Sequence, residues 1–243
     1  MSSEEKHHWV EQLRQHLGRA KALRDAAGTD PRMAEDRLRL RTWQAERLAA
    51  TYRDLLESER YRDAARFFLT DLYGPKDFSE RDHEVERILP TLAATLPAAG
   101  IRTVALAIEV DALSEELDAA MVDELRRARA MPKITGKAYA EAYRRCGRRD
   151  RRELQLRLIG DIGEALAALV RKPLIHAALR LMRAPAKLAG LAELHAFLED
   201  GYNAFHHMGD PAEFLAAIAT REETILQQLF DGAPRPFYIQ GND

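Results

Sequence analysis

The densest group of chemically capable side chains in this sequence is a basic segment that runs from Lys133 to Arg157. Within it, nine lysines and arginines outnumber three acidic residues, which leaves six positive charges. Positive charge at this density predicts contact with an anionic partner, because lysines and arginines neutralise phosphates and displace their counterions. The partner would be a nucleic acid, a nucleotide or another protein, and the arginines expected to contact it are Arg144, Arg145, Arg148, Arg149, Arg151 and Arg152.

An alternative partner for the basic segment lies in the same chain. Seven acidic residues fall between residues 109 and 124, on what periodicity predicts to be the outer face of a long helix. Oppositely charged faces commonly pair in helical proteins, and charged faces are also commonly just solvated. The sequence therefore leaves open whether the basic segment binds a partner or neutralises this acidic helix.

Two polar side chains interrupt helices that are otherwise apolar on one face. His195 and Glu222 lie on the last two long helices, and an antiparallel hairpin would bring them together. A buried histidine beside a carboxylate suits acid–base chemistry because each group shifts the pKa of the other, although a plain core hydrogen bond is more common. A pocket between helices for haem, an apolar ligand or a substrate would be lined by Phe68, Tyr73, His195, Tyr202 and Glu222.

Metal and cofactor chemistry has little support in the sequence. Glu80 and His83 have the Glu-x-x-His spacing of di-iron bundles, but no second copy follows. Cys146 is the only cysteine, and no glycine-rich phosphate loop or nucleophile motif is present. We therefore assign no catalytic residue, no metal ligand and no cofactor from the sequence, and whether the protein is an enzyme stays open.

The elements that carry these residues are predicted to be helices. Hydrophobic residues make up 46% of the chain and charged residues 31%, a balance typical of amphipathic helices. Apolar side chains recur at three- and four-residue steps throughout, and no stretch alternates as a strand does. This pattern predicts an all-α bundle of about eight to nine helices arranged as long antiparallel hairpins.

Proline and capping residues predict where several helices begin and end. Asp30 is expected to cap a helix that starts at Pro31, where the missing proline N–H costs nothing, and that runs to about residue 57. The sequence also predicts helices over residues 59–73, 101–130 and 173–185, the last of them bracketed by prolines.

A change of charge near residue 131 is the candidate domain boundary. The chain is predicted to be a single helical domain over residues 1–243, with two helical halves, 1–131 and 132–243, as the alternative. The lone cysteine predicts a reducing compartment, and the N-terminus lacks the apolar run of a signal peptide. No stretch approaches the length that spans a membrane, so we expect a cytoplasmic protein, and its oligomeric state stays open.

A short motif resembles that of a bacterial family. Residues 67–75, Phe-Phe-Leu-Thr-Asp-Leu-Tyr-Gly-Pro, resemble the Phe-Phe-Leu-Glu-Glu-Leu-Tyr (FFLEELY) motif after which an uncharacterised family is named. Thr70 and Asp71 stand where that motif has two glutamates, and residues 170–173 and 181–186 are also similar to the family. The resemblance implies a cytoplasmic bacterial protein, and it implies no activity, cofactor or catalytic residue.

The lack of a catalytic motif favours a non-enzymatic interaction or ligand-binding protein that uses a groove or the basic segment. The alternative is an enzyme, or a binder of haem or an apolar ligand, with its pocket near His195 and Tyr202. A chromophore or bound metal in the purified protein would favour this alternative. Salt-dependent binding of RNA or polyphosphate would instead favour the basic segment.

Overall fold

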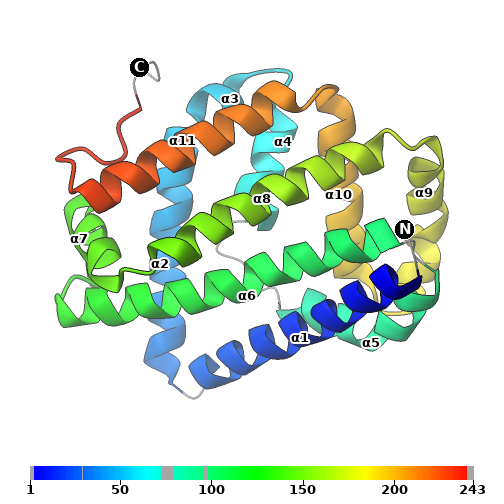
Figure 1. Ribbon diagram of the computed structural model, residues 1–243, viewed down its shortest axis with the longest axis horizontal. Helices are drawn as coiled ribbons and strands as arrows, with labels where there is room; N and C mark the ends of the chain where they lie inside the picture. The colour runs from blue at the N-terminus through cyan, green and yellow to red at the C-terminus, as the bar shows by residue number, and fades with distance from the viewer. Residues whose placement is uncertain (1–2, 29, 73–78, 96–97, 240–243) are drawn as a thin grey trace.

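The computed structural model is helical throughout the residues that it describes, which are 3–28, 30–72, 79–95 and 98–239 (Figure 1). This confirms the predicted all-α class, since 85% of the chain is helical and the described part holds eleven α-helices and no strand. The number of helices exceeds the prediction because two of them are only five and six residues long. The elements are α1 (Ser3–Gly28), α2 (Pro31–Thr51), α3 (Arg53–Glu57), α4 (Arg62–Phe67), the π-helical turn η1 (Phe68–Leu72), α5 (Ser79–Thr95), α6 (Ala98–Arg127), α7 (Gly136–Cys146), α8 (Arg149–Val170), α9 (Pro173–Leu188), α10 (Ala192–Met208) and α11 (Ala212–Asp231).

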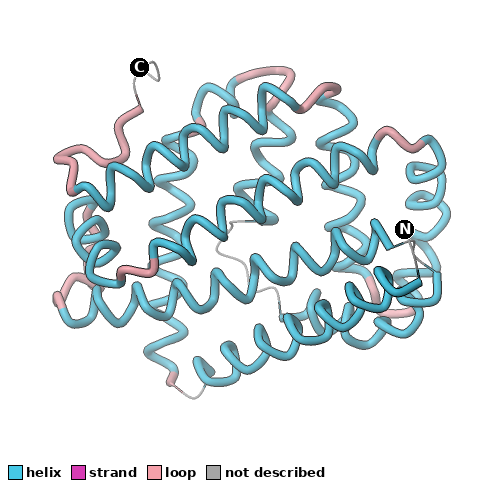
Figure 2. The backbone as a smooth tube through the Cα atoms, in the orientation of Figure 1, coloured by secondary structure: helices cyan, strands magenta, loops and turns pink. Residues whose placement is uncertain are grey.

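The helices form two crossed layers. The long helices α1, α6, α8 and α11 lie side by side in one layer, and α2, α4 and α10 cross behind it (Figure 1). Helix α7 closes one end of the bundle, and α9 lies at the opposite edge against α10 and α8. Figure 2 shows that the loops connect the ends of these helices. The side chains between the layers therefore come from helices and not from loops, and the packing of the helices fixes their positions.

The start of α2 follows the predicted cap, but its end does not follow the prediction. Asp30 accepts a hydrogen bond from a backbone N–H of the first helical turn at 3.0 Å, and Pro31 occupies that turn. The helix was expected to reach residue 57, but Tyr52 leaves helical geometry (φ −112°, ψ 24°) and the chain restarts as α3. No proline or glycine marks this break, so the sequence gives no local signal for it.

Two other predicted helices also have different ends. The helix predicted over residues 59–73 starts at Arg62 as α4 and continues as η1, and Tyr73 lies outside the described residues. Pro185 does not end α9, which continues for three more residues. A proline in a helix leaves the carbonyl four residues earlier without its donor. That carbonyl belongs to Leu181, an exposed residue in the last turns of α9, where water can hydrate it.

The largest apolar cluster takes side chains from both halves of the chain. The ring of Phe68 lies 6.1 Å from that of Phe205 and 5.4 Å from that of Phe214, measured between ring centroids. Gly201 lets the neighbouring ring of Phe67 pack against α10, because a Cβ there would lie 2.8 Å from Cζ of Phe67. We refer to the cluster around Phe68, Phe205 and Phe214 as the aromatic core.

Candidate functional site

One face of α6 carries a row of polar side chains that point into the bundle. Asp111, Ser114, Glu115 and Asp118 are three or four residues apart, so they share one side of the helix. Glu115 and Asp118 are buried, with only 2% and 6% of their surface exposed. The prediction of an outward acidic face on this helix is therefore wrong. The physical reason is that arginines of α1 and α2 pair with the row and make its burial tolerable.

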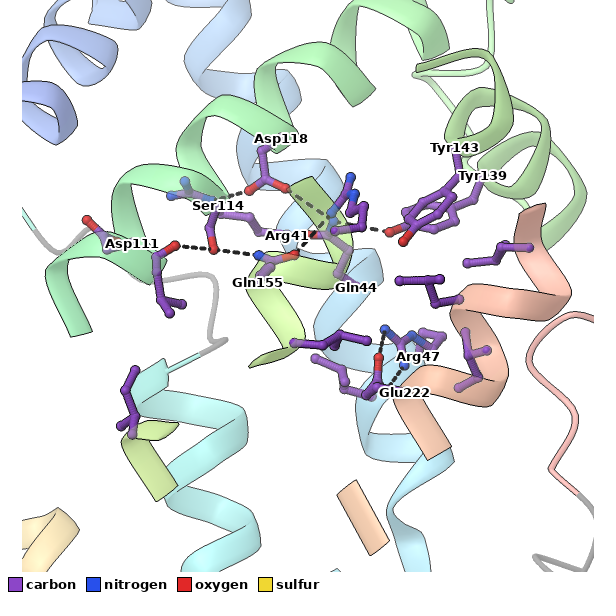
Figure 3. Close-up of a pocket in the computed structure, with 18 of the residues that line it drawn as sticks. Arg41, Gln44, Arg47, Asp111, Ser114, Asp118, Tyr139, Tyr143, Gln155 and Glu222 are labelled. Atoms are coloured by element: carbon purple, nitrogen blue, oxygen red, sulfur yellow. Dashed lines mark hydrogen bonds and ion pairs between the residues drawn. The ribbon is translucent and has the colours of Figure 1, made fainter. Parts of the chain in front are cut away.

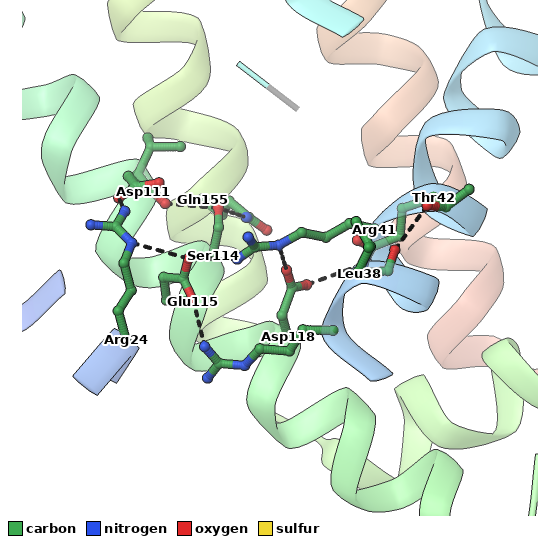
Figure 4. A network of polar contacts seen from close by, with 12 residues as sticks. Arg24, Leu38, Arg41, Thr42, Asp111, Ser114, Glu115, Asp118 and Gln155 are labelled. Atoms are coloured by element: carbon green, nitrogen blue, oxygen red, sulfur yellow. Dashed lines mark hydrogen bonds and ion pairs between the residues drawn. The ribbon is translucent and has the colours of Figure 1, made fainter. Parts of the chain in front are cut away.

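Arginines from two other helices neutralise this row (Figure 4). Arg37 Nη1 lies 2.7 Å from Glu115 Oε2, and Arg41 Nη2 lies 2.5 Å from Glu115 Oε1. Arg41 also uses its Nε to bind Asp118 Oδ2 at 3.1 Å. Arg24 of α1 pairs with Asp111. Each carboxylate of the row thus forms an ion pair with at least one guanidinium group.

The Arg41 guanidinium stays charged despite its burial. Burial alone would lower its pKa, but attraction to Asp118 and Glu115 outweighs that effect and raises the pKa above its ordinary value. The other oxygen of Asp118 accepts a hydrogen bond from Gln44 Nε2 at 3.2 Å. The same Gln44 nitrogen lies 3.4 Å from the hydroxyl oxygen of Tyr139. These contacts join α2, α6 and α7 through charged and polar side chains.

A second buried ion pair links α2 to α11 (Figure 3). Arg47 donates from Nη1 and Nη2 to the two carboxylate oxygens of Glu222 at 2.7 and 3.3 Å. The Tyr52 hydroxyl donates to the same carboxylate at 2.9 Å. Burial lowers the pKa of Arg47, but the attraction of Glu222 outweighs burial and raises it. Glu222, the polar residue on the otherwise apolar face of α11, is therefore part of an ion pair.

A cavity of about 120 Å³ lies beside these pairs, between α2, α6, α7, α8 and α11 (Figure 3). Tyr139 and Tyr143 of α7 lie together at one side of it, and Gln155 of α8 donates to Ser114 Oγ at 2.8 Å. Burial raises the pKa of Tyr143, so its hydroxyl stays protonated. The cavity wall thus combines charged, amide and phenol groups with aliphatic side chains, and it can both pair with a charge and form hydrogen bonds.

Arg152 of α8 lines this cavity and has no carboxylate partner among the residues that the structure describes. Only 8% of its surface is exposed, its Nη1 lies 3.5 Å from Gln155 Oε1, and its Nη2 has no hydrogen-bond partner. Its guanidinium carbon lies 4.6 Å from the ring centroid of Tyr143. An aromatic face attracts a cation but supplies no negative charge. Because a buried cation is costly without a counterion, Arg152 is suited to receive an anion.

Charged side chains gather in the cavity wall and directly behind it. They are five guanidinium groups and four carboxylates, and Arg152 is the guanidinium that has no carboxylate partner among the described residues. A charged group held out of water in this way is a candidate binding or catalytic group. We refer to these nine residues as the polar layer: Arg24, Arg37, Arg41, Arg47, Arg152, Asp111, Glu115, Asp118 and Glu222.

The other predicted anion-binding arginines of the basic segment lie outside the cavity wall. Arg148 and Arg151 both pair with Glu116, so the basic segment meets the acidic helix at that residue. The rest of the buried acidic row is neutralised from α1 and α2 instead. The remaining arginines are Arg149, which pairs with Glu153, Arg144, which donates to the backbone carbonyl of Leu229, and the exposed Arg145.

The structure gives His195 and Glu222 different partners, and no hydrogen bond or ion pair joins the two within the described residues. His195 Nε2 is hydrogen-bonded to the backbone carbonyl of Leu179 at 2.9 Å, which ties α10 to α9. Tyr202 stacks on His176, with ring centroids 5.3 Å apart. These residues hold α9 and α10 together, and neither His195 nor Tyr202 lines the 120 Å³ cavity.

Phe68, a further pocket candidate, is also separate from the cavity. Phe68 belongs to the aromatic core, and the space beside it, about 20 Å³, has room for little more than one water molecule. Tyr73 and the side chain of Glu80 lie outside the described residues. Among the side chains that are described, no three from His, Cys, Asp and Glu gather as metal ligands would. Of the five predicted pocket residues, Glu222 is thus the one placed in the cavity wall.

The site residues that sequence analysis missed lie mainly on α2. Arg37, Arg41 and Gln44 continue the spacing of the buried Leu48 at steps of three and four residues, which places them on the core side of the helix. The acidic row of α6 repeats at the same steps. Two helices with matching rows of opposite charge are the signal that could have revealed the site, although single arginines on a helix are normally exposed.

The comparisons with known proteins place this site within a recognised domain. One family, described as a domain of unknown function (DUF8198), matches residues 23–236, a range that holds every residue of the polar layer and the cavity wall. No curated protein and no solved structure matches the chain. The chain therefore belongs to the DUF8198 family.

Proposed function

We propose that this protein binds a small anion in the cavity between α2, α6, α7, α8 and α11, with Arg152 as the group that pairs with it. The observation that supports the proposal is the buried Arg152 guanidinium, which lines the cavity with one nitrogen free of hydrogen bonds. A planar guanidinium presents parallel N–H donors that match a carboxylate or a phosphate. A bound anion would give Arg152 the counterion that it lacks among the described residues.

The volume of the cavity limits the ligand. A protein cavity of about 150 Å³ holds benzene, so a ligand of this cavity has only a few non-hydrogen atoms. A volume of about 120 Å³ is enough for a small carboxylate or inorganic phosphate, and too little for a nucleotide or a haem. The size supports the ligand-binding hypothesis over the haem-binding alternative at this place.

The chemistry of the wall supports binding more than catalysis. Ser114 Oγ donates to the backbone carbonyl of Val110 at 2.7 Å and accepts from Gln155, so no base is placed to activate it. No histidine or cysteine is among the residues that line the cavity. The wall offers one unpaired charge and several hydrogen-bonding groups, which is what recognition of a small polar ligand requires.

Thermal unfolding with acetate and with inorganic phosphate as probes tests the proposal. A probe at about one hundred times its Kd adds about 2.7 kcal/mol to the free energy of unfolding, which raises Tm by several degrees. We expect Arg152→Met to abolish this response. The matched control is Arg157→Met, which removes an exposed arginine of the same helix and should leave the response unchanged.

Two outcomes would contradict the proposal. One is an equal response of the wild type and Arg152→Met to the probes. The other is a wild type that responds to neither probe and carries no small bound mass in native mass spectrometry after purification from a bacterial host.

Some broader expectations remain proposals. We propose a cytoplasmic location in a bacterium, supported by the lone Cys146 and by the resemblance of residues 67–75 to the FFLEELY family. The exposed Arg145 and the partly exposed Arg148 remain candidates for contact with an anionic partner. None of these proposals is needed for the cavity argument.

A further inference from the structure

Helix α9 exposes an unusual amount of apolar surface. Leu188 is 90% exposed, Leu181 77% and Met182 52%, although folded proteins usually bury side chains of this kind when they cluster. Together with Leu198 of α10, they are four of the six large hydrophobic side chains that are exposed in the described part of the chain. A cluster of this kind marks an interaction surface.

The exposed apolar residues of α9 form one stripe. At about 100° per residue, Leu181, Leu188 and Met182 fall within roughly 120° of one another around the helix. The buried Ala186 lies next to Met182 around the helix, on the side of α9 that packs against α10. The stripe borders this packed side and is exposed at the edge of the bundle, where α9 lies (Figure 1). Two smaller exposed residues lie within the same arc, Ala178 and Pro185.

The segment that carries the stripe is positively charged. Between Glu164 and Glu193 the chain has five lysines and arginines and no acidic residue. Arg180 and Lys187 are exposed, and they lie about 140° and 160° around α9 from the centre of the stripe. Arg183 lies on the same side as Arg180 and Lys187 and pairs with Glu199 of α10, which leaves four of the five charges. The five residues are Arg171, Lys172, Arg180, Arg183 and Lys187.

The charge and the depth of the stripe favour one kind of occupant. A second copy of α9 would bring two sets of positive charges together, which opposes self-association. Protein interfaces are usually anchored by bulky aromatic side chains, and the stripe consists of leucine, methionine, alanine and proline. A shallow apolar stripe on a positively charged helix fits an anionic lipid surface. There, apolar side chains enter the headgroup boundary, and the positive charge of the segment is attracted to the anionic lipids.

We infer that α9 docks the protein onto anionic lipid membranes as a peripheral helix. The contacts that hold α9 against α10 in the free protein include the Arg183–Glu199 ion pair, the hydrogen bond from His195 to the Leu179 carbonyl and the stacking of Tyr202 on His176. The stripe therefore keeps its orientation before it meets lipid. Docking needs no insertion across the bilayer, and within the described residues no helix is long and apolar enough to cross one. This inference does not depend on the anion cavity.

Vesicle flotation of the full chain tests the inference. The probes are vesicles of phosphatidylcholine alone and vesicles of equal parts phosphatidylcholine and phosphatidylglycerol. We expect binding to the anionic vesicles at low salt, weak binding to the neutral ones, and release at high salt, because screening removes the attraction. The double variant Leu181→Asp/Leu188→Asp should reduce binding at least about tenfold, since it places two negative charges in the stripe.

The controls separate docking from unfolding and from self-association. Leu38→Asp changes a leucine of α2 that is 53% exposed and far along the chain from α9, and it should bind as the wild type does. The circular dichroism of all variants should remain helical. Three results would overturn the inference: equal binding to both vesicle types, unchanged binding of the double variant, or a dimer in light scattering that the double variant dissociates.

Discussion

The aromatic core and the polar layer are both buried between the same crossed helices, but they are filled in different ways. In the aromatic core, the rings of Phe68, Phe205 and Phe214 approach within 5.4 to 6.1 Å and leave a space of about 20 Å³. The polar layer pairs four carboxylates with four guanidinium groups, leaves Arg152 unpaired and borders a cavity of about 120 Å³.

The difference follows from the physics of the two contacts. Apolar packing is not directional, so side chains can shift until little space remains. Ion pairs in the interior are directional, and their attraction must also offset the cost of removing the charges from water. The distance between the helices is therefore set by the geometry of the ion pairs and not by close packing. One region therefore supplies stability to the fold, while the other holds charge and space that a ligand can use.

The largest effect should come from the aromatic core. Phe68→Ala should lower the free energy of unfolding by about 3 to 5 kcal/mol, because it removes a buried ring and leaves a cavity. Chemical denaturation followed by circular dichroism measures this change. Leu38→Ala is the control, since an exposed leucine should change stability by no more than about 0.5 kcal/mol. A loss below about 1 kcal/mol for Phe68→Ala would mean that the aromatic core does not carry stability as described here.

The next effect should come from the centre of the polar layer. Glu115→Gln leaves Arg37 and Arg41 buried without their shared carboxylate, and it should cost about 3 kcal/mol. The matched control is Glu116→Gln, one residue further along, which pairs with the partly exposed Arg148 and Arg151 and should cost about 1 kcal/mol or less. Equal losses in the two variants would break the distinction between the buried layer and the surface.

The two regions also differ in how far the sequence predicts them. The aromatic core can be predicted from the sequence, because Phe68 and its apolar neighbours repeat at helical steps. Apolar side chains at such steps usually form the buried face of a helix. The polar layer was not, because arginine and glutamate on helices are exposed in most proteins. The sequence therefore predicts an outward acidic face on α6, paired with the basic segment or solvated, although Glu115 is among the most buried residues of that face.

The errors in the helix ends have a similar origin. The break at Tyr52 has no glycine or proline, and it occurs where the Tyr52 hydroxyl reaches Glu222 on a helix about 170 residues away. At Pro185 the sequence predicts the end of a helix, but α9 continues to Leu188. The proline costs little there, because water can hydrate the carbonyl that it leaves without a donor. A long-range contact accompanies the first end and solvent exposure of the helix the second, and a single sequence displays neither. Arg152 was named among the anion-binding candidates, but its burial could not be foreseen.

A smaller effect on stability is expected at the unpaired charge itself. Arg152→Met replaces a buried cation that has no counterion with an apolar side chain of similar length, so stability should stay within about 1 kcal/mol of the wild type or increase. Denaturation in a buffer without small organic anions or phosphate measures this. A loss of about 3 kcal/mol would mean that Arg152 has a structural partner, and it would remove the contrast between the paired and unpaired parts of the polar layer.

The smallest effect should come from an ion pair outside both regions, which sets the lower limit of the comparison. Arg221 donates to both carboxylate oxygens of Asp54 at 2.7 Å. These hydrogen bonds and the attraction of the Arg221 charge lower the pKa of Asp54 below its ordinary value, and burial opposes them with a smaller effect. A lowered pKa in the folded state means that the pair stabilises the fold above the unfolded pKa near 4, and that this contribution is lost as pH falls through the folded pKa. The Asp54 side chain is 46% exposed, so solvent screens the pair, and Asp54→Asn should cost less than about 1 kcal/mol at neutral pH.

The difference in stability between Asp54→Asn and the wild type should shrink toward zero in acid, because protonation removes the charge that the substitution removes. Denaturation of both proteins at neutral pH and at about pH 3 measures this. A neutral-pH loss as large as that of Glu115→Gln would show that burial does not set the strength of these ion pairs. The ion pairs of the polar layer would then contribute no more to the free energy of unfolding than ion pairs on the surface of the bundle.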